Sequence, residues 1–170
     1  GNVTSHKDPK GQQEDWTVNQ PQHVVRYLSR IVFGATRYQT DSIWNANDDL
    51  VERRVQNLDE AGAAYPNDTL TEVFEYNILH YPGSETREKT RNDGSLPGTV
   101  RTEHFYDANL NPTAVKSPLA VSGGQADNIV TTRFDERDLA YKVIRGDTDV
   151  DPTTIPAGAA VETLNYDPNG

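Results

Sequence analysis

Four aspartates placed at the ends of predicted strands are the first candidates for chemistry. Each one follows a β-prone run and a large apolar or aromatic residue: Asp59, Asp107, Asp135 and Asp167. Positioned carboxylates can serve as general acids or bases. Aspartate at a strand end also bonds the backbone N–H groups of a turn, which is the commoner use of this residue type. We therefore predict turn capping and no catalysis at these four positions.

A second acidic group has the alternation of a calcium loop, with carboxylates at Asp147, Asp149 and Asp151. An EF-hand also needs glycine at its sixth position and glutamate at its twelfth. Those positions hold Pro152 and Gly158, so the sequence excludes an EF-hand. A weaker, irregular calcium site at the three aspartates stays a candidate beside a solvated acidic loop.

Other catalytic patterns are missing from the sequence. The four histidines are scattered without metal-ligand spacing, no Gly-x-Ser-x-Gly elbow occurs, and the chain has no cysteine. We predict that the chain is not an enzyme and that it holds no cofactor apart from the candidate calcium ion.

Two features of the sequence could involve carbohydrate. Asn2 and Asn67 begin Asn-x-Thr triplets, which are candidate glycosylation sites. Trp16, Trp44 and Tyr38 could stack on a bound sugar if they are exposed, although large aromatics more often pack between sheet and loops. The sequence alone leaves both uses open.

Composition narrows the class of partner. Acidic residues outnumber basic ones by 26 to 16, which gives a formal charge of −10. This balance argues against binding to nucleic acid or to an anionic membrane. Apolar residues make up 34% of the chain, below the usual range of roughly 45–50%. We expect no membrane insertion and a thin core that is shared along the chain.

The elements that position these residues recur along the sequence. A β-prone run, an aromatic residue, an aspartate and a turn follow one another in residues 100–111, 129–139 and 161–170. The aromatic–aspartate pairs in these copies are Tyr106–Asp107, Phe134–Asp135 and Tyr166–Asp167.

Weaker copies of the same pattern lie elsewhere in the chain. Residues 51–62 form a copy with Leu58 before Asp59 and Gly62 closing the turn, and Tyr76–Asn77 marks a degenerate one. Residues 166–170 joined to residues 1–11 also read as one complete copy. Either the chain is one period of a longer tandem array, or its ends fall between neighbouring repeats by coincidence, and we favour the first interpretation.

Alternation of apolar and polar residues predicts strands with one half-buried face. Val25, Tyr27, Ile31 and Phe33 are expected on one such face. Residues 48–58 fit a short helix or a strand, and we favour the strand. The polar stretches 1–16, 83–97 and 117–128 are predicted to be loops or loosely ordered, and binding would concentrate in such loops.

The repeated pattern resembles the YD-repeat, or RHS-repeat, family, whose motif is Tyr-Asp-x-x-Gly. The best match runs from Tyr166 to Gly170, while the copies at Tyr106 and Phe134 lack the glycine and have Asn109 and Asp138 in the turn. Asn and Asp tolerate positive φ, which such a turn requires. The resemblance implies an all-β fold of tandem antiparallel hairpins, spanning residues 1–170 as a single run, that winds into a spiralling sheet. In the family, such sheets form shells or tubes.

The resemblance also carries an expectation for function. We expect a structural segment of a large extracellular or cell-surface protein, which builds a β-shell, tube or fibre by continuing strand pairing into neighbouring copies or repeats. One alternative is a wall segment of a toxin-enclosing cocoon, as in RHS toxins. Another is a module that binds carbohydrate or a cell-surface partner through its loops.

Overall fold

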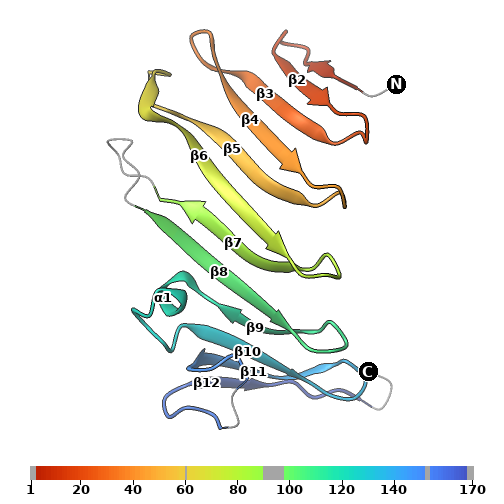
Figure 1. The fold of residues 1–170 in the computed structure, drawn as a ribbon, viewed down its shortest axis with the longest axis vertical. Coiled ribbons are helices and arrows are strands. Elements are labelled where there is room, and N and C mark those ends of the chain that lie inside the picture. The colour runs from red at the N-terminus through yellow and green to blue at the C-terminus, as the bar shows by residue number, and fades with distance from the viewer. Residues whose placement is uncertain (1–2, 60, 90–97, 152–153, 168–170) are drawn as a thin grey trace. The chain divides into compact units, whose positions relative to one another are not determined.

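The computed structural model describes residues 3–59, 61–89, 98–151 and 154–167, and its fold is all-β, as the sequence predicts (Figure 1). The strands follow in chain order: β1 (Ser5–Lys7), β2 (Gln13–Val18), β3 (Val24–Phe33), β4 (Thr36–Trp44), β5 (Leu50–Leu58), β6 (Ala64–Tyr76), β7 (Pro82–Glu88), β8 (Thr99–Tyr106), β9 (Pro112–Lys116), β10 (Ile129–Phe134), β11 (Ala140–Asp147) and β12 (Ala160–Thr163).

Helix contributes little to the described chain. The helix α1 (Pro118–Val121) has four residues, with a proline in its first turn. No helix among the described residues has the length and apolar character to cross a membrane. The ambiguous segment 48–58 contains the strand β5, so the strand prediction for it is confirmed.

The contacts divide the chain into two compact units. The first unit comprises Gly1–His80 and Thr86–Val100, and the second comprises Tyr81–Glu85 and Arg101–Gly170. β7 therefore contributes residues to both units. Each unit is described below by itself.

In the first unit, β1 to β6 pair antiparallel with their neighbours in the order of the chain (Figure 1). Cross-strand partners share a face of the sheet. One row of partners runs through Trp16, Tyr27, Thr40, Val55 and Leu70. All five are only partly buried, so this row does not form a closed core.

The predicted common face of Val25, Tyr27, Ile31 and Phe33 is wrong at Ile31. Between Leu28 and Ile31 the strand β3 carries one residue more than its partner β4, which is a β-bulge. An extra residue reverses the side on which later side chains point. Ile31 is accordingly 48% exposed, and the side chain of Phe33 lies outside the described residues.

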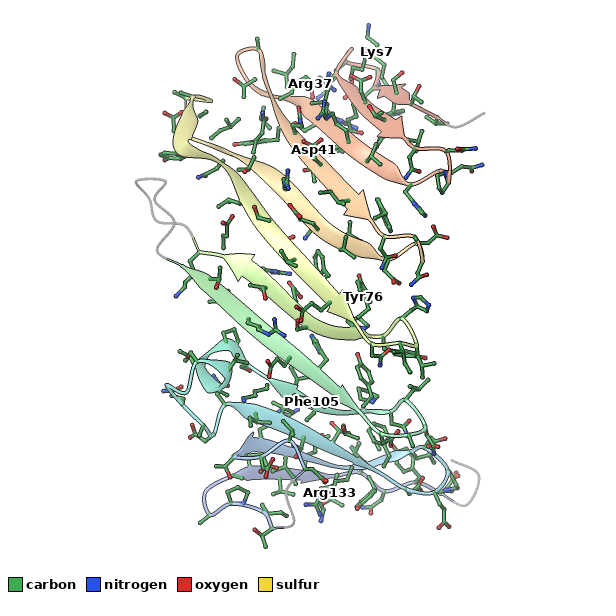
Figure 2. The ribbon with its side chains drawn as sticks, viewed as in Figure 1. Lys7, Arg37, Asp41, Tyr76, Phe105 and Arg133 are labelled. Carbon is green, nitrogen blue, oxygen red and sulfur yellow. The ribbon has the colours of Figure 1, made fainter. Side chains whose placement is uncertain are left out.

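The guanidinium of Arg37 fills this bulge (Figure 2). It donates to the carbonyl oxygens of Leu28, at 3.0 Å, and Ser29, at 2.5 Å. It also reaches across to β2, where it donates to the Asp15 carboxylate at 2.7 Å and to the Gln13 carbonyl at 3.0 Å. The irregular backbone is thus satisfied by a side chain.

In the second unit, β8 to β12 again pair antiparallel in chain order. One row of cross-strand partners runs through Phe105, Ala114, Thr131, Ile144 and Val161. The three central members are at most 2% exposed. The core of this unit therefore lies on that row.

Two long connections cover this core. Residues 117–128 hold α1, and residues 148–159 join β11 to β12. Ala120 from the first connection packs with Ala114 and Ile129, and Val150 from the second packs against the same cluster. Residues 117–128 are the insert that the sequence predicts, although they contain a short helix.

The other two predicted loops are partly wrong. Residues 1–16 contain β1 and the start of β2, and residues 83–97 contain most of β7. Polar composition misleads here because both faces of these short strands are partly open to solvent, and such strands need few apolar residues. Residues 90–97 lie outside the described residues.

Candidate functional site

An asparagine or aspartate begins each of seven hairpin turns. Its carbonyl accepts the N–H of the residue three positions later, at 2.9–3.3 Å, and its side-chain oxygen accepts an N–H from two or four residues later. The seven residues are Asp8, Asn19, Asn45, Asp59, Asn77, Asp107 and Asp135. The carboxylates of Asp59, Asp107 and Asp135 are therefore engaged with turn backbone, and Asp167 has an interaction of its own.

The fourth residue of every one of these turns has a positive φ, between 62° and 81°. Glycine occupies this position at Gly11 and Gly62, and Asp138 occupies it in the turn that starts at Asp135. In the turn that starts at Asp107 the residue is Leu110, not Asn109. The turn therefore tolerates residue types that a glycine-based motif search would miss.

An aromatic residue just before the turn is tied to the neighbouring strand of the sheet, the one that precedes its own. The hydroxyls of Tyr76, Tyr106 and Tyr166 donate to the carbonyls of Leu50, Pro82 and Ala140, at 3.0, 3.0 and 2.8 Å. Each acceptor is the first residue of its strand. Figure 2 shows Tyr76 at the end of β6. The bond joins two adjacent strands, the first strand of one hairpin and the last strand of the hairpin before it, so it links one of these turns to the preceding one.

The indole of Trp44 makes the same kind of contact in the first unit, donating to the carbonyl of Val24 at 3.2 Å. Val24 again begins a strand. Phe134 holds the equivalent place before Asp135 but has no hydroxyl. The aromatic–Asx pairs at Trp44, Tyr76, Tyr106, Phe134 and Tyr166 thus form one series, called here the anchored turns.

Adjacent turns also bond to one another. In the first unit, His23 lies 3.5 Å from Asp48, and His80 lies 3.0 Å from Asp49. In the second unit, the side-chain amides of Asn109 and Asn111 both donate to Asp138, at 2.9 and 2.7 Å. Within each unit these contacts connect the turns that lie at one end of the strands.

The turn carboxylates of the second unit have lowered pKa values. The side-chain amide of Asn111, followed by backbone N–H groups, lowers the pKa of Asp107. The N–H of Leu139 and the side chain of Arg137 lower the pKa of Asp135. Hydrogen bonds to the ionised form cause both shifts, which identifies these groups as turn caps.

The copy at residues 51–62 differs from the anchored turns. Leu58 ends β5 and Asp59 starts the turn into β6, whereas Asn45 and Asn77 follow β4 and β6. Because neighbouring strands are antiparallel, the Asp59 turn lies at the opposite end of the strands of the first unit. The copy at residues 51–62 therefore differs from the anchored turns in its position, and Leu58 has no polar group that could bond a neighbouring strand.

Two strands present backbone groups to solvent. The backbone N–H of Trp16 donates to the carbonyl of Thr4, and the backbone N–H of Asp8 donates to the carbonyl of Gln12. The alternate residues Ser5 and Lys7 therefore direct their N–H and C=O groups away from β2. All residues of β1 are exposed.

The same reasoning applies to β12. Leu164 donates to the carbonyl of Tyr141 at 3.0 Å, and Val143 pairs with Glu162. Val161 and Thr163 therefore direct their backbone groups away from β11. The described part of the chain thus has two edge strands whose outward groups are open to a further strand.

The three candidate calcium ligands are not gathered. Asp147 is fully buried, and its carboxylate accepts the Thr131 hydroxyl at 2.8 Å. Asp149 accepts backbone N–H groups within its own loop. Among the described residues no three His, Asp or Glu side chains could hold a metal ion together, so the structure does not bring Asp147, Asp149 and Asp151 into a site.

The carbohydrate-related residues are dispersed. Trp16 packs near Tyr27, with ring centroids 6.0 Å apart, and Trp44 stacks on His23 at 4.4 Å. Tyr38 is 38% exposed on β4. Asn67 is on β6, but its side chain, like the whole of Asn2, lies outside the described residues.

Sequence reasoning missed the Trp44–Asn45 turn and the turn after Val18. Both begin with asparagine, whereas the search was guided by aspartate. An aromatic residue followed by either Asn or Asp would have found the first. Val18–Asn19 has no aromatic, and only the spacing to the later turns marks it.

No protein-family model matches the sequence, and no curated protein matches it either.

Proposed function

We propose that the chain is a structural segment of a large extracellular YD-repeat protein, which extends a β-sheet into neighbouring segments to build a shell, tube or fibre. The observation that carries this proposal is the anchored turn, in which a tyrosine hydroxyl bonds a carbonyl 26, 24 or 26 residues earlier. A contact of this kind ties each hairpin to the one before it. A series of such contacts suits an array that grows by adding hairpins.

The edge strands support the same role. A two-stranded hairpin is at best marginally stable alone in water, so each hairpin of such an array depends on its neighbours. The outward backbone groups of Ser5 on β1 and Val161 on β12 fit the addition of another strand. The formal charge of −10 keeps the faces of an assembled sheet soluble.

The Tyr166 anchor indicates where the next strand enters. Its bond to Ala140 is in place, and Asp167 follows it as in the other anchored turns. In our proposal a strand from a neighbouring segment pairs with the outward groups of β12.

Electron microscopy of the purified chain, paired with the intact mass of its native polypeptide, tests the proposal. We expect filaments or tubes from the wild type. Val161→Pro removes only an outward N–H and blocks strand addition, so it should abolish the assemblies. Val161→Thr keeps that N–H and serves as the control.

The outcomes separate the alternatives. Assemblies lost in Val161→Pro and kept in Val161→Thr support the structural role. A closed particle made by one long polypeptide favours the cocoon wall. A monomer at every concentration, from a native polypeptide of this size, contradicts both.

A further inference from the structure

The connection between β11 and β12 is fixed against the second unit at its start. Asp147 is fully buried, and its carboxylate accepts the Thr131 hydroxyl and the Thr148 N–H, both at 2.8 Å. Three residues later Val150 packs against the buried cluster that includes Ala114. A buried carboxylate that has hydrogen-bond partners holds its segment in place. The part of the connection from Asp147 to Asp151 therefore forms a fixed wall.

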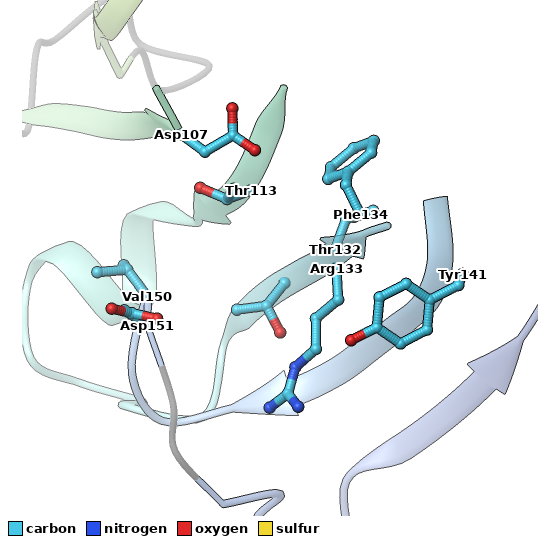
Figure 3. A pocket seen from close by; sticks show the side chains of 9 residues that line it. Asp107, Thr113, Thr132, Arg133, Phe134, Tyr141, Val150 and Asp151 are labelled. Atoms are coloured by element: carbon cyan, nitrogen blue, oxygen red, sulfur yellow. The ribbon is translucent and has the colours of Figure 1, made fainter. Parts of the chain in front are cut away.

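A groove of about 530 Å³ lies between this wall and β9, β10 and β11. Figure 3 shows Val150 and Asp151 on one side of it and Arg133 and Tyr141 on the other. Its volume falls within the range of roughly 300–1,000 Å³ typical of small-molecule sites.

The lining of the groove is polar, in contrast to the apolar cluster beside it. It includes Thr113, Tyr141 and Asp151, which carry two hydroxyls and a carboxylate. Within the described part of the chain, no protein hydrogen bond involves these three side-chain groups. Carboxylates accept hydrogen bonds, and hydroxyls both donate and accept them. The groove can therefore bind a ligand that both donates and accepts hydrogen bonds.

Two aromatic rings complete the lining, those of Phe134 and Tyr141. Rings offer flat apolar surface, which suits the C–H face of a sugar ring. A ligand's hydroxyls can bond Thr113 and Asp151 in place of water, so displacing water from these two groups costs little.

We propose that this groove binds an uncharged oligosaccharide. The carboxylates of Asp107 and Asp151 outnumber the single guanidinium of Arg133 in the lining, and together with the net charge of −10 they disfavour an anionic ligand. The hydroxyls disfavour an apolar one, because it would leave them without partners. The site is distinct from Trp16, Trp44 and Tyr38, and it is independent of the assembly role.

Isothermal titration calorimetry tests the site, with cellohexaose, xylohexaose, mannohexaose and chitohexaose as uncharged probes and polygalacturonate as the anionic one. We expect at least one uncharged probe to bind with a Kd of about 1 mM or tighter. Titrations of Ser5→Pro, which blocks strand addition at β1, separate sugar binding from assembly.

Two variants locate the binding. Tyr141→Ala and Asp151→Asn should each weaken it by about 10-fold, the effect of losing roughly 1.4 kcal/mol. Asp151 is exposed, so its variant decides the matter if Tyr141→Ala does not fold. Glu136→Gln makes the same charge change at an exposed position in the neighbouring turn, outside the groove, and should leave the Kd unchanged.

Three results would overturn the proposal. The first is no heat with any uncharged probe at about 10 mM, ten times the expected Kd. The second is a preference for polygalacturonate. The third is binding that Asp151→Asn and Tyr141→Ala leave unaltered, which places the sugar elsewhere on the chain.

Discussion

The two units use the same antiparallel hairpins but cover them differently. In the second unit the central row through Ala114, Thr131 and Ile144 is closed from solvent. In the first unit the row through Tyr27 and Val55 stays half-buried. The difference comes from the connections, because in the second unit Ala120 and Val150, from two longer connections, pack over the sheet, whereas the connections described between β1 and β6 are short turns.

The first unit relies on charged side chains instead. Arg26 pairs with Asp41 on the neighbouring strand, and Arg30 pairs with Glu14 on β2 and with Asp8 in the turn before it. Ion pairs this exposed contribute about 0–1 kcal/mol each. The comparison teaches that the hairpin repeat fixes the sheet, while the connections decide whether a unit has a core.

Truncating the core of the second unit should have the largest effect. Ile144 is fully buried, and Ile144→Ala should lower the free energy of unfolding by about 2–5 kcal/mol through lost burial and a cavity. Val55→Ala, on the half-buried row of the first unit, should cost about 1 kcal/mol or less, in line with its smaller burial. Urea denaturation monitored by circular dichroism measures both. Equal losses would remove the distinction between the units.

Changes at the anchored turns should have an intermediate effect on the free energy of unfolding. Tyr106→Phe removes the hydroxyl that bonds Pro82 and should cost about 1 kcal/mol. Phe134→Tyr should stabilise by up to about 1 kcal/mol, because Pro112 begins β9 as Pro82 begins β7 and offers its carbonyl. Thermal unfolding of the two variants checks this pair. A destabilised Phe134→Tyr would show that the anchor geometry does not extend to that turn.

The smallest expected effect is on the free energy of unfolding at acidic pH, and it is absent near neutral pH. The anchored turns begin with Asp107 and Asp135 in the second unit but with Asn45 and Asn77 in the first. The pKa values of Asp107 and Asp135 are lowered in the folded chain. Their contribution to stability is therefore complete above the unfolded pKa of about 3.9 and is lost as the pH falls below it toward the folded values.

Unfolding experiments between about pH 5 and 2, which span the unfolded aspartate pKa, test this difference. The double variant Asp107→Asn and Asp135→Asn should lose less stability on acidification than the wild type. The reciprocal change Asn45→Asp should increase the acid sensitivity. Parallel curves for all three proteins would mean that these carboxylates titrate alike in the folded and unfolded states.

Much of the fold could be predicted from the sequence because the repeat is local. Alternation within strands and the Tyr106–Asp107 and Phe134–Asp135 pairs are sufficient to indicate hairpins. The bulge before Ile31 could not be found this way, since it interrupts the alternation and the side chain that bonds its backbone, Arg37, belongs to the next strand. The wall at Val150 was also missed, because Asp147 looks like one of three solvated acids until the fold buries it.

The groove illustrates the same limit. Thr113, Thr132 and Tyr141 come from three strands and carry no common motif. Asp151 was noticed only as a calcium candidate. Their proximity depends on strand register and on how the 148–159 connection folds, and neither can be inferred from a single sequence.

The neighbour-only strand pairing within each unit has a consequence for how the chain folds. Every strand pairs with the strand made just before it, so ordering a hairpin requires closing only the connection between two consecutive strands, which keeps the entropic cost low. We expect folding to proceed in step with synthesis or export, each new hairpin being templated by its predecessor. Pulse-labelling hydrogen exchange during refolding would then show protection spreading along consecutive hairpins, whereas simultaneous protection of all strands would point to a single concerted step.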